Sequence, residues 1–230
     1  MTIIQTVRNY RATADLHDDG TVTTSGQPAY GGDSSAVQHL LTNVTAITAT
    51  NYAFAAIKKD STVLTWGHPT YGGNSNAVQH LLTNIKTIAS NDGAFAALKS
   101  DGTVVTWGPK NTGGDSSTEE HLLTNVTTIT ATLFAFAALK ADGTVVTWGP
   151  QDWGGDSTAV QHRLTNVTAI FANCYAIAAL KADGTVVTWG IPEYGGNSNA
   201  VQKDLINIQT IVVDHYGFTA IKRDGSKISW

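Results

Sequence analysis

Residues 94–108 read AFAALKSDGTVVTWG, and residues 135–149 repeat them with one change as AFAALKADGTVVTWG. The same hairpin pattern returns every 41 residues, and its turns fall at Gly20, Ser61, Gly102, Gly143, Gly184 and Gly225. A fixed period of this length is typical of repeat architectures built from one supersecondary unit. Residues present in every copy are therefore expected to maintain the repeat, and functional residues are sought where the copies differ.

Each copy contains three runs rich in Val, Ile, Thr and aromatic residues, which suit a pleated and mostly buried surface. In the second copy these runs are residues 44–50, 52–58 and 62–66. An Asp-Gly pair separates the second and third runs at 101–102, 142–143, 183–184 and 224–225, which favours a tight hairpin. Each copy is therefore predicted to be an antiparallel three-stranded meander.

A Gly-Gly linker follows each of the first five hairpins, as in YGGDSSAVQHLLTN at 30–43. Its Asp33, Ser34 and Ser35 are expected to cap a short helical turn through Gln38–Leu41. A single three-stranded sheet cannot cover both of its faces. Successive sheets must therefore stack, either as propeller blades or as an open solenoid.

Two observations favour an all-β, six-bladed β-propeller of 41-residue repeats that forms a single domain. Six periods of 41 residues amount to 246, so a chain of 230 residues lacks about one linker, as a ring cut within its sixth linker would. Small residues occupy the first strands, where blades converge on an axis: Ala46, Ala49, Ala89, Ala131 and Ala172. A monomeric closed ring is expected, and an open arc that pairs with a second chain is the alternative. The blades are expected at about 1–26, 43–67, 84–108, 125–149, 166–190 and 207–230.

Composition bounds the function classes. The net charge of −4 comes without a run of Lys or Arg, so the electrostatic footprint of a nucleic-acid-binding protein is missing. The longest apolar stretches, such as Phe134–Leu139, are far shorter than a membrane span. The first ten residues, MTIIQTVRNY, lack the pattern of a signal peptide, and the single Cys174 cannot form an internal disulfide. We expect a cytoplasmic protein that binds neither nucleic acid nor membrane, with export by another route as the alternative.

The pattern I-x-A-x(3)-A-F-A-A-L-K-x-D-G-T-V-V-T-W-G resembles the repeat of the regulator of chromosome condensation family, and the match covers all six copies. The compact, bacterial-type repeat is also similar to that of the propeller-type β-lactamase inhibitory proteins, which bind an enzyme. The resemblance implies a β-propeller. It does not imply nucleotide exchange on a small GTPase, because no residue of that activity matches. The chain also has Gly-Gly-Asp/Asn-Ser where the regulator family tends towards Gly-Gln-Leu-Gly.

Several recurring polar residues are expected to serve the repeat. The linker histidines fall on different blades, which argues against a metal site: His39, His80, His121 and His162. The carboxylates at the hairpin tips are expected to stabilise the turns in which they lie, through hydrogen bonds to the local backbone. The sequence has no Ser-His-Asp order, phosphate-cradling loop or Cys/His cluster. We expect no enzyme activity, no metal and no cofactor.

The variable loops carry the candidate binding residues. Between Trp-Gly and Gly-Gly the last place is aromatic in four of five linkers, with Thr112 as the exception: Tyr30, Tyr71, Trp153 and Tyr194. The loop between the first two strands supplies the others: Tyr52, Asp92, Phe134, Tyr175 and Tyr216. Both sets are expected on one face, because this loop and the exit of the third strand emerge at the same end of a meander. Aromatics among small polar residues are typical of a recognition surface. The alternative is that the aromatic before Gly-Gly only packs on the next blade.

The first blade departs from the others. Thr13 stands where most copies have Phe, Ser25 where they have Trp, and Asp15 where they have Ala. The joint loss of two aromatics suggests that they pack together in the other blades, because truncating one alone in a core is costly. This blade is expected to form a seam that no linker covers, as divergent terminal repeats commonly do. A partner that docks at the seam is the alternative.

The leading hypothesis is a non-catalytic module that binds a protein partner through the aromatic loops. A multivalent carbohydrate-binding lectin is the first alternative, because aromatic-Gly-Gly-Asp/Asn-Ser recurs at residues 30–34, 71–75, 153–157 and 194–198. The second alternative is an engineered or structural repeat scaffold without a natural ligand. It is motivated by the third to fifth hairpins, which differ at only two positions in fifteen.

Overall fold

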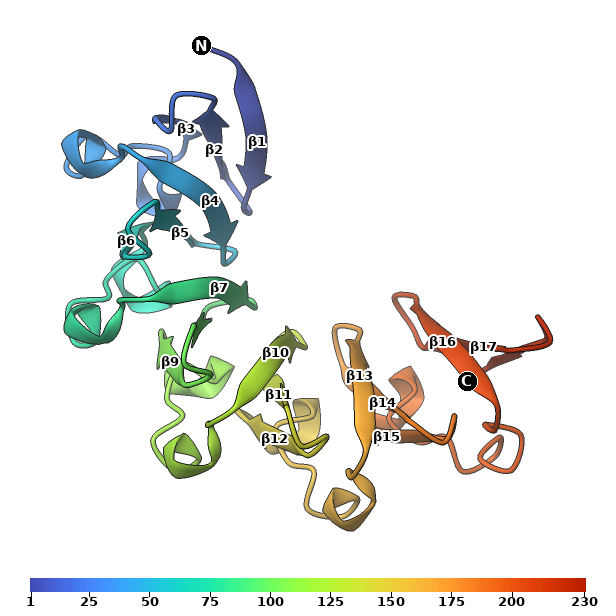
Figure 1. Cartoon of the computed structure of the whole chain (residues 1–230). Coiled ribbons are helices and arrows are strands. Elements are labelled where there is room, and N and C mark those ends of the chain that lie inside the picture. The colour runs from blue at the N-terminus through green and yellow to red at the C-terminus, as the bar shows by residue number, and fades with distance from the viewer. The chain divides into compact units, whose positions relative to one another are not determined.

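Eighteen short strands form six antiparallel sheets of three, and each sheet takes consecutive strands in sequence order (Figure 1). The computed structural model describes residues 1–230. The first three sheets comprise β1 (Ile3–Arg8), β2 (Ala12–His17) and β3 (Val22–Gly26); β4 (Val44–Ala49), β5 (Ala53–Lys58) and β6 (Val63–Gly67); and β7 (Ile85–Ser90), β8 (Phe95–Lys99) and β9 (Val104–Trp107). The last three comprise β10 (Val126–Ala131), β11 (Phe136–Lys140) and β12 (Val145–Trp148); β13 (Val167–Ala172), β14 (Ala176–Lys181) and β15 (Val186–Gly190); and β16 (Ile208–Val213), β17 (Phe218–Lys222) and β18 (Lys227–Ser229). The predicted three-stranded meander is confirmed in every copy.

The helices are all single 3-10 turns within the linkers. A turn directly before the Gly-Gly pair occurs in all five linkers: η1 (Pro28–Tyr30), η3 (Pro69–Tyr71), η5 (Lys110–Thr112), η7 (Gln151–Trp153) and η9 (Pro192–Tyr194). A second turn follows in the first four: η2 (Gln38–Leu40), η4 (Gln79–Leu81), η6 (Glu120–Leu122) and η8 (Gln161–Arg163). None of these helices has the length or apolar character needed to span a membrane.

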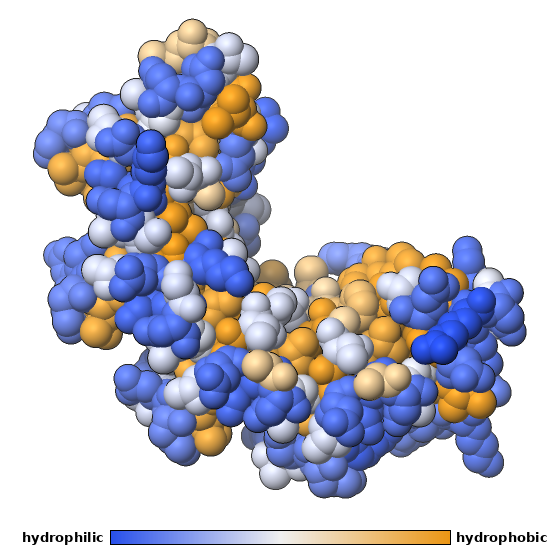
Figure 2. Space-filling view, in the orientation of Figure 1, coloured by the Kyte–Doolittle hydropathy of each residue, from blue (hydrophilic) through white to orange (hydrophobic).

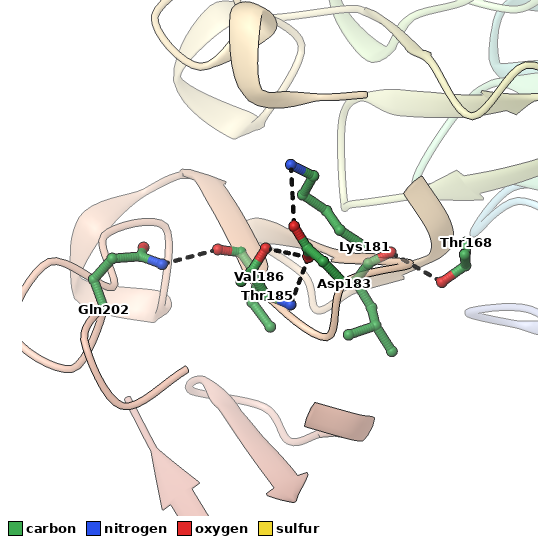
Figure 3. A network of polar contacts seen from close by, with 7 residues as sticks. Thr168, Lys181, Asp183, Thr185, Val186 and Gln202 are labelled. Atoms are coloured by element: carbon green, nitrogen blue, oxygen red, sulfur yellow. Dashed lines mark hydrogen bonds and ion pairs between the residues drawn. The ribbon is translucent and has the colours of Figure 1, made fainter. Parts of the chain in front are cut away.

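The turn between the second and third strands is built around an Asp-Gly pair. In the fifth sheet the N–H and hydroxyl of Thr185 donate to Asp183 Oδ1 over 2.9 and 2.6 Å, and Lys181 Nζ lies 3.9 Å from Asp183 Oδ2 (Figure 3). Gly184 has φ +77°, a left-handed conformation that glycine adopts without steric cost. Its N–H donates to Lys181 O, while Lys181 N–H donates to Thr185 O. The pair thus closes a three-residue loop in which glycine forms the bulge.

Four of the five linkers are tied by a glutamine to the strand that precedes them. In the first linker Ser34 Oγ donates to Gln38 Oε1 over 2.7 Å, and Gln38 Nε2 donates to Val22 O over 2.9 Å. The fifth linker repeats this tie with Gln202 and Val186 (Figure 3). The third strand lies at the edge of its sheet, and the glutamine side chain bonds a carbonyl there that a fourth strand would otherwise bond.

The expected cap by Asp33, Ser34 and Ser35 is wrong. The second turn covers Gln38–Leu40, its N-cap residue is Val37, and no side chain caps it. Asp33 Oδ1 instead accepts the N–H of Ser35. The carboxylate bonds to an amide two residues away because this local arrangement is available before the helical turn begins.

The sheets fall into two units, Met1–Ser116 with the first three sheets and Ser117–Trp230 with the last three. We call them the N-terminal and C-terminal units. Within the N-terminal unit the first strands of successive sheets are hydrogen-bonded through side chains. The amide of Gln5 bonds both the N–H and the C=O of Ile47 at 3.0 Å, and Ser90 Oγ donates to Ala49 O at 2.8 Å. Small residues such as Ala49 thus lie where successive blades adjoin.

A Phe–Trp pair lies in the core of most blades, and the fifth blade has Ile177 beside Trp189 instead. Phe54 pairs with Trp66 across β5 and β6, and their ring centroids lie 5.2 Å apart. Both are buried against the first sheet, beside Ala14 and Leu16. The same stacking joins Phe95 to Trp107 and Phe136 to Trp148. The prediction that these two positions pack together is confirmed.

In the first sheet, Thr13 and Ser25 face each other at the same register. Thr13 is half-buried and Ser25 is exposed, whereas Phe54 is fully buried. Asp15 is half-buried on the same side of the sheet and accepts a hydrogen bond from Thr6 Oγ1 at 2.5 Å. This side of the first sheet is therefore polar. The seam itself stays a prediction.

Candidate functional site

In the N-terminal unit the loop aromatics stack into one row. The ring of Tyr52 lies 5.5 Å from that of Tyr30 and 4.4 Å from that of Tyr71, and both pairs are stacked. We call Tyr30, Tyr52 and Tyr71 the first ladder. At its start Arg11 lies over the rings of both Tyr10 and Tyr30, at 5.7 and 5.6 Å, which is cation–π geometry. The row therefore combines aromatic faces with a positive charge at one end.

In the C-terminal unit five candidate residues form a longer row, which we call the second ladder: Phe134, Trp153, Tyr175, Tyr194 and Tyr216. Successive ring centroids lie 4.5, 5.3, 4.0 and 6.2 Å apart. Each blade contributes a first-loop ring and a linker ring in contact, and the linker ring then meets the first-loop ring of the following blade. Residues of the two variable sets thus lie together on one face of each unit, as the sequence predicts.

A polar residue directly after the first strand hydrogen-bonds the backbone of both the first loop and the linker turn that carry a pair of stacked rings. The side-chain oxygen of Asn173 accepts the N–H groups of Tyr175 and Ala176, each at 2.8 Å. Its Nδ2 donates to Tyr194 O at 2.9 Å. Thr132 does the same in the preceding blade, where its hydroxyl donates to Trp153 O at 2.7 Å and accepts from Ala135 N–H at 3.0 Å. The backbone of each aromatic pair is therefore fixed from beneath.

The candidate Asp92 has a different position from the aromatic residues. Its Oδ1 accepts Asn51 Nδ2 at 2.7 Å, and its backbone O accepts the Asn51 N–H at 2.9 Å. Gly93 occupies the place that Tyr52 holds in the preceding blade, and a Cβ there would lie 2.8 Å from Tyr71 Cδ1. Asp92 therefore helps to join two loops, and the first ladder ends with Tyr71 against Gly93.

The linker aromatics do pack on the next blade, as the alternative interpretation holds. Tyr30 reaches Tyr52, Tyr71 reaches Gly93, and Trp153 reaches Tyr175. The rings nevertheless keep solvent-accessible surface, because Tyr52, Tyr71 and Trp153 are only half-buried. Tyr216 is 70% exposed. Packing and recognition are thus compatible for these residues.

The two ladders differ in charge. The first loops and linker turns of the N-terminal unit contain Arg11, Lys110 and Asp92, which sum to +1. The corresponding loops of the C-terminal unit contain Asp152, Glu193 and Asp214, which sum to −3. Burial raises the pKa of Tyr52, so this phenol stays neutral and keeps its proton at physiological pH. The two ladders therefore lie among loops of different charge.

A cavity of about 550 Å³ lies beside the second ladder, between the fourth linker and the end of β15. Asp152 and Asp156 contribute carboxylates to its lining, while Val160, Trp189 and Pro192 contribute apolar walls. Trp189 is fixed because its Nε1–H donates to Gly154 O at 3.0 Å. The cavity therefore combines a rigid aromatic wall with negative charge.

In the expected sugar site the serine of each loop is buried, whereas the Asp or Asn before it stays accessible. The serine of each aromatic-Gly-Gly-Asp/Asn-Ser loop is buried and bonded inside its own blade, as Ser75 is to Thr65 and Gln79. The side-chain Oδ1 of Asn74 accepts the N–H of Asn76. These serines are bonded to side chains of their own blade and linker, so they do not offer the hydrogen-bonding groups that the sugar site requires of them. The carbohydrate-binding alternative itself stays a prediction.

Apolar side chains are also exposed away from the ladders. Ile3 and Ile4 of β1 are 52% and 62% exposed, and Figure 2 shows hydrophobic surface over this strand. Leu40, Leu81 and Leu122 of the linkers are 42–43% exposed. These leucines end the second turns of their linkers and are not part of either ladder, so they provide a comparison set.

Several of the residues described above were missed at the level of sequence. Tyr10 and Arg11 lie in the first loop of the divergent first blade, which the regular pattern of the later copies does not mark as functional. Asn173 and its counterparts recur every 41 residues as Asn, Thr or Asp, a signal that marks them as structural. The pairing of Asp152 with Asp156 was a visible signal, since no other linker has acidic residues at both places.

Comparisons with known proteins establish the fold. No protein-family model matches the sequence, and no curated protein matches it. Among solved structures, Prp20p from Saccharomyces cerevisiae, the yeast RCC1, is 18% identical with a TM-score of 0.58, over 99% of this chain and 71% of that one. The ectodomain of receptor kinase CR4 from Physcomitrella patens is 15% identical with a TM-score of 0.57, over 99% of this chain and 61% of that one. Human WBSCR16 is 16% identical with a TM-score of 0.54, over 82% of this chain and 61% of that one. The chain has an RCC1-type β-propeller fold.

Proposed function

We propose that this chain is a non-catalytic module that binds a protein partner through its two aromatic ladders. The observation that carries the proposal is the stacking of both variable sets into continuous rows. Aromatic side chains supply large contact areas at low entropic cost and dominate the energetics of protein interfaces. Here they are concentrated at the positions where the repeats differ from one another.

The backbone beneath the ladders supports a preorganised surface. Asn173 fixes the loops of Tyr175 and Tyr194, and neighbouring first loops are joined by backbone bonds such as Leu133 N–H to Cys174 O at 2.8 Å. A surface that is ordered before binding loses less entropy when the partner arrives. Prp20p, which shares the fold, has been described with binding to Gsp1p and histones. A protein partner is the corresponding proposal for this chain.

The proposal is tested with a display library of random peptides, selected on the purified chain. A ladder variant carries Tyr52→Ser, Trp153→Ser and Tyr216→Ser. A control variant carries Leu40→Ser, Leu81→Ser and Leu122→Ser, which removes exposed apolar surface outside the ladders. Peptides that use the ladders are expected to bind the native chain and the control, and to lose binding to the ladder variant.

The thermal midpoint of each variant is measured by circular dichroism before binding is compared. Similar midpoints show that lost binding reflects the surface and not the fold. Selected peptides that bind the ladder variant as well as the native chain would show that the recognition surface lies elsewhere.

A further inference from the structure

We propose that the second ladder and the cavity beside it bind a basic segment of the partner, with one arginine or lysine side chain entering the cavity. This inference rests on the proposed function, because it specifies the chemistry of the protein partner. It assigns the acidic residues of the fourth linker a role in recognition that the first ladder cannot share.

The cavity has the shape and lining for a cationic side chain. Its volume of about 550 Å³ falls within the range of about 300–1,000 Å³ that is usual for ligand sites in proteins. The aliphatic part of an arginine or lysine would lie against Trp189, Val160 and Pro192. Its charged end would meet the carboxylates of Asp152 and Asp156, which line the same cavity.

The carboxylate of Asp156 is held in its charged form. Its Oδ1 accepts the N–H of Thr158 at 2.8 Å. Hydrogen bonds from the side chain and backbone of Thr158, and a further one from Gln151, lower the pKa of Asp156. The negative charge is therefore present at physiological pH.

The acidic pair is particular to this linker. The place of Asp152 is taken by Ala29, Thr70, Asn111 and Glu193 in the other linkers, and that of Asp156 by Asp33, Asn74, Asp115 and Asn197. The second linker thus has the neutral Thr70 and Asn74 at both places. Since the repeat folds without the pair, its presence in the fourth linker is not required by the architecture.

The surroundings extend the same charge preference. Asp152 lies in η7 directly before Trp153, so the cavity is continuous in sequence with the second ladder. The loops that carry this ladder contain Asp152, Glu193 and Asp214 and no Lys or Arg. Exposed aromatic faces attract guanidinium and ammonium groups, and nearby carboxylates add to that attraction. Charge complementarity therefore selects a basic partner segment over a neutral or acidic one.

The experiment measures the binding of a fluorescein-labelled peptide of alternating arginine and glycine by fluorescence anisotropy. The test variant carries Asp152→Asn and Asp156→Asn. It is expected to fold, because Asn74 and Asn197 make the same turn bond at the place of Asp156. The control variant carries Asp33→Asn and Glu120→Gln, which removes the same number of negative charges elsewhere. Asn and Gln are the residues of other linkers at these two places.

The test variant is expected to weaken binding about tenfold at low salt, while the control changes it less than about twofold. The difference should shrink as salt screens the charges. Equal weakening by both variants would overturn the inference, because net charge alone would then explain the binding. Absence of binding to the native chain would overturn it too.

Failure of this inference is distinct from failure of the proposed function. If library peptides depend on the ladders but contain no excess of Arg or Lys, the ladders recognise a partner of different chemistry. If no peptide depends on the ladders, the proposed function itself fails, whatever the arginine peptide does.

Discussion

The indole Nε1–H of Trp107 donates to the carbonyl of Gly72 over 3.0 Å, a contact between residues 35 apart in sequence. The same bond joins Trp66 to Gly31 and Trp189 to Gly154. The first glycine of the linker therefore lies against the core of the next blade, as Gly72 does against Phe95 and Gly154 against Ile177. The linker glycine is therefore part of the interface between blades.

Replacing Gly72 by alanine is expected to destabilise the chain by about 3 kcal/mol. Gly72 has φ +93°, and a Cβ there would lie 2.6 Å from two carbons of the Phe95 ring. Gly225→Ala is the matched control, since Gly225 has φ +85° but no atom within 4 Å of the added Cβ. It is expected to cost only the backbone strain, about 1 kcal/mol. Urea unfolding of both variants gives the comparison, and equal losses would refute the role of the Phe95 contact.

Asn173→Ala is expected to cost about 2–3 kcal/mol and to disorder the pairing of Tyr175 with Tyr194. The variant leaves the N–H groups of Tyr175 and Ala176 and the carbonyl of Tyr194 without their partner. Asn173→Thr should restore most of the stability, because Thr132 makes the equivalent bonds in the preceding blade. Chemical denaturation measures the stability, and near-ultraviolet circular dichroism reports on the order of the rings.

The stacking of Tyr52 on Tyr71 is expected to contribute about 0.5–1.5 kcal/mol beyond the burial of the two rings. A double-mutant cycle of Tyr52→Ala and Tyr71→Ala, followed by urea unfolding, measures this coupling. Tyr10→Ala combined with Tyr71→Ala serves as the control pair, because Tyr10 makes its ring contact with Arg11. Additive effects in both pairs would show that the first ladder is not energetically continuous.

Acid is expected to lower the stability of the chain below about pH 4. Hydrogen bonds from Thr103 hold the pKa of Asp101 below the ordinary aspartate value of 3.8. A carboxyl whose pKa is lower in the folded state contributes stability above its unfolded pKa and loses it as pH falls through the folded pKa. The same hairpin bond lowers the pKa of Asp60, Asp142, Asp183 and Asp224.

The measurement is the urea midpoint as a function of pH for the native chain and for Asp101→Asn. Asparagine keeps the acceptor oxygen but does not titrate, so the two curves should converge as pH decreases. Parallel curves would show that Asp101 makes no pH-dependent contribution.

Much of the fold could be predicted from the period of the repeat. The period located the hairpins, and the joint loss at Thr13 and Ser25 identified the Phe–Trp pair that packs in the other blades. These features follow from strand alternation and hairpin geometry, which are local. The common face of Tyr52 and Tyr71 followed from the topology of a meander in the same way.

The remaining features depend on which polar groups find each other in space. The sequence predicts that Ser34 caps a helical turn, but its hydroxyl donates to Gln38 instead. The amide of Gln38 is held in place there because it also donates to the carbonyl of Val22. A repeat shows that a serine recurs and does not show its partner. The cavity beside Asp152 likewise depends on the distance between the fourth linker and the end of β15. The spacing of residues in the sequence does not define that distance.

The bond between Gln38 and Val22 attaches the first linker to its own blade, while the ring of Tyr30 in the same linker rests on Tyr52 of the next blade. A gene segment of one period therefore encodes a blade, its strap and half of the contact to its neighbour. Duplicating or exchanging such a segment would carry a recognition residue to a new place without altering the backbone bonds around it. Binding specificity in this chain could then diversify by shuffling whole periods as well as by point substitution.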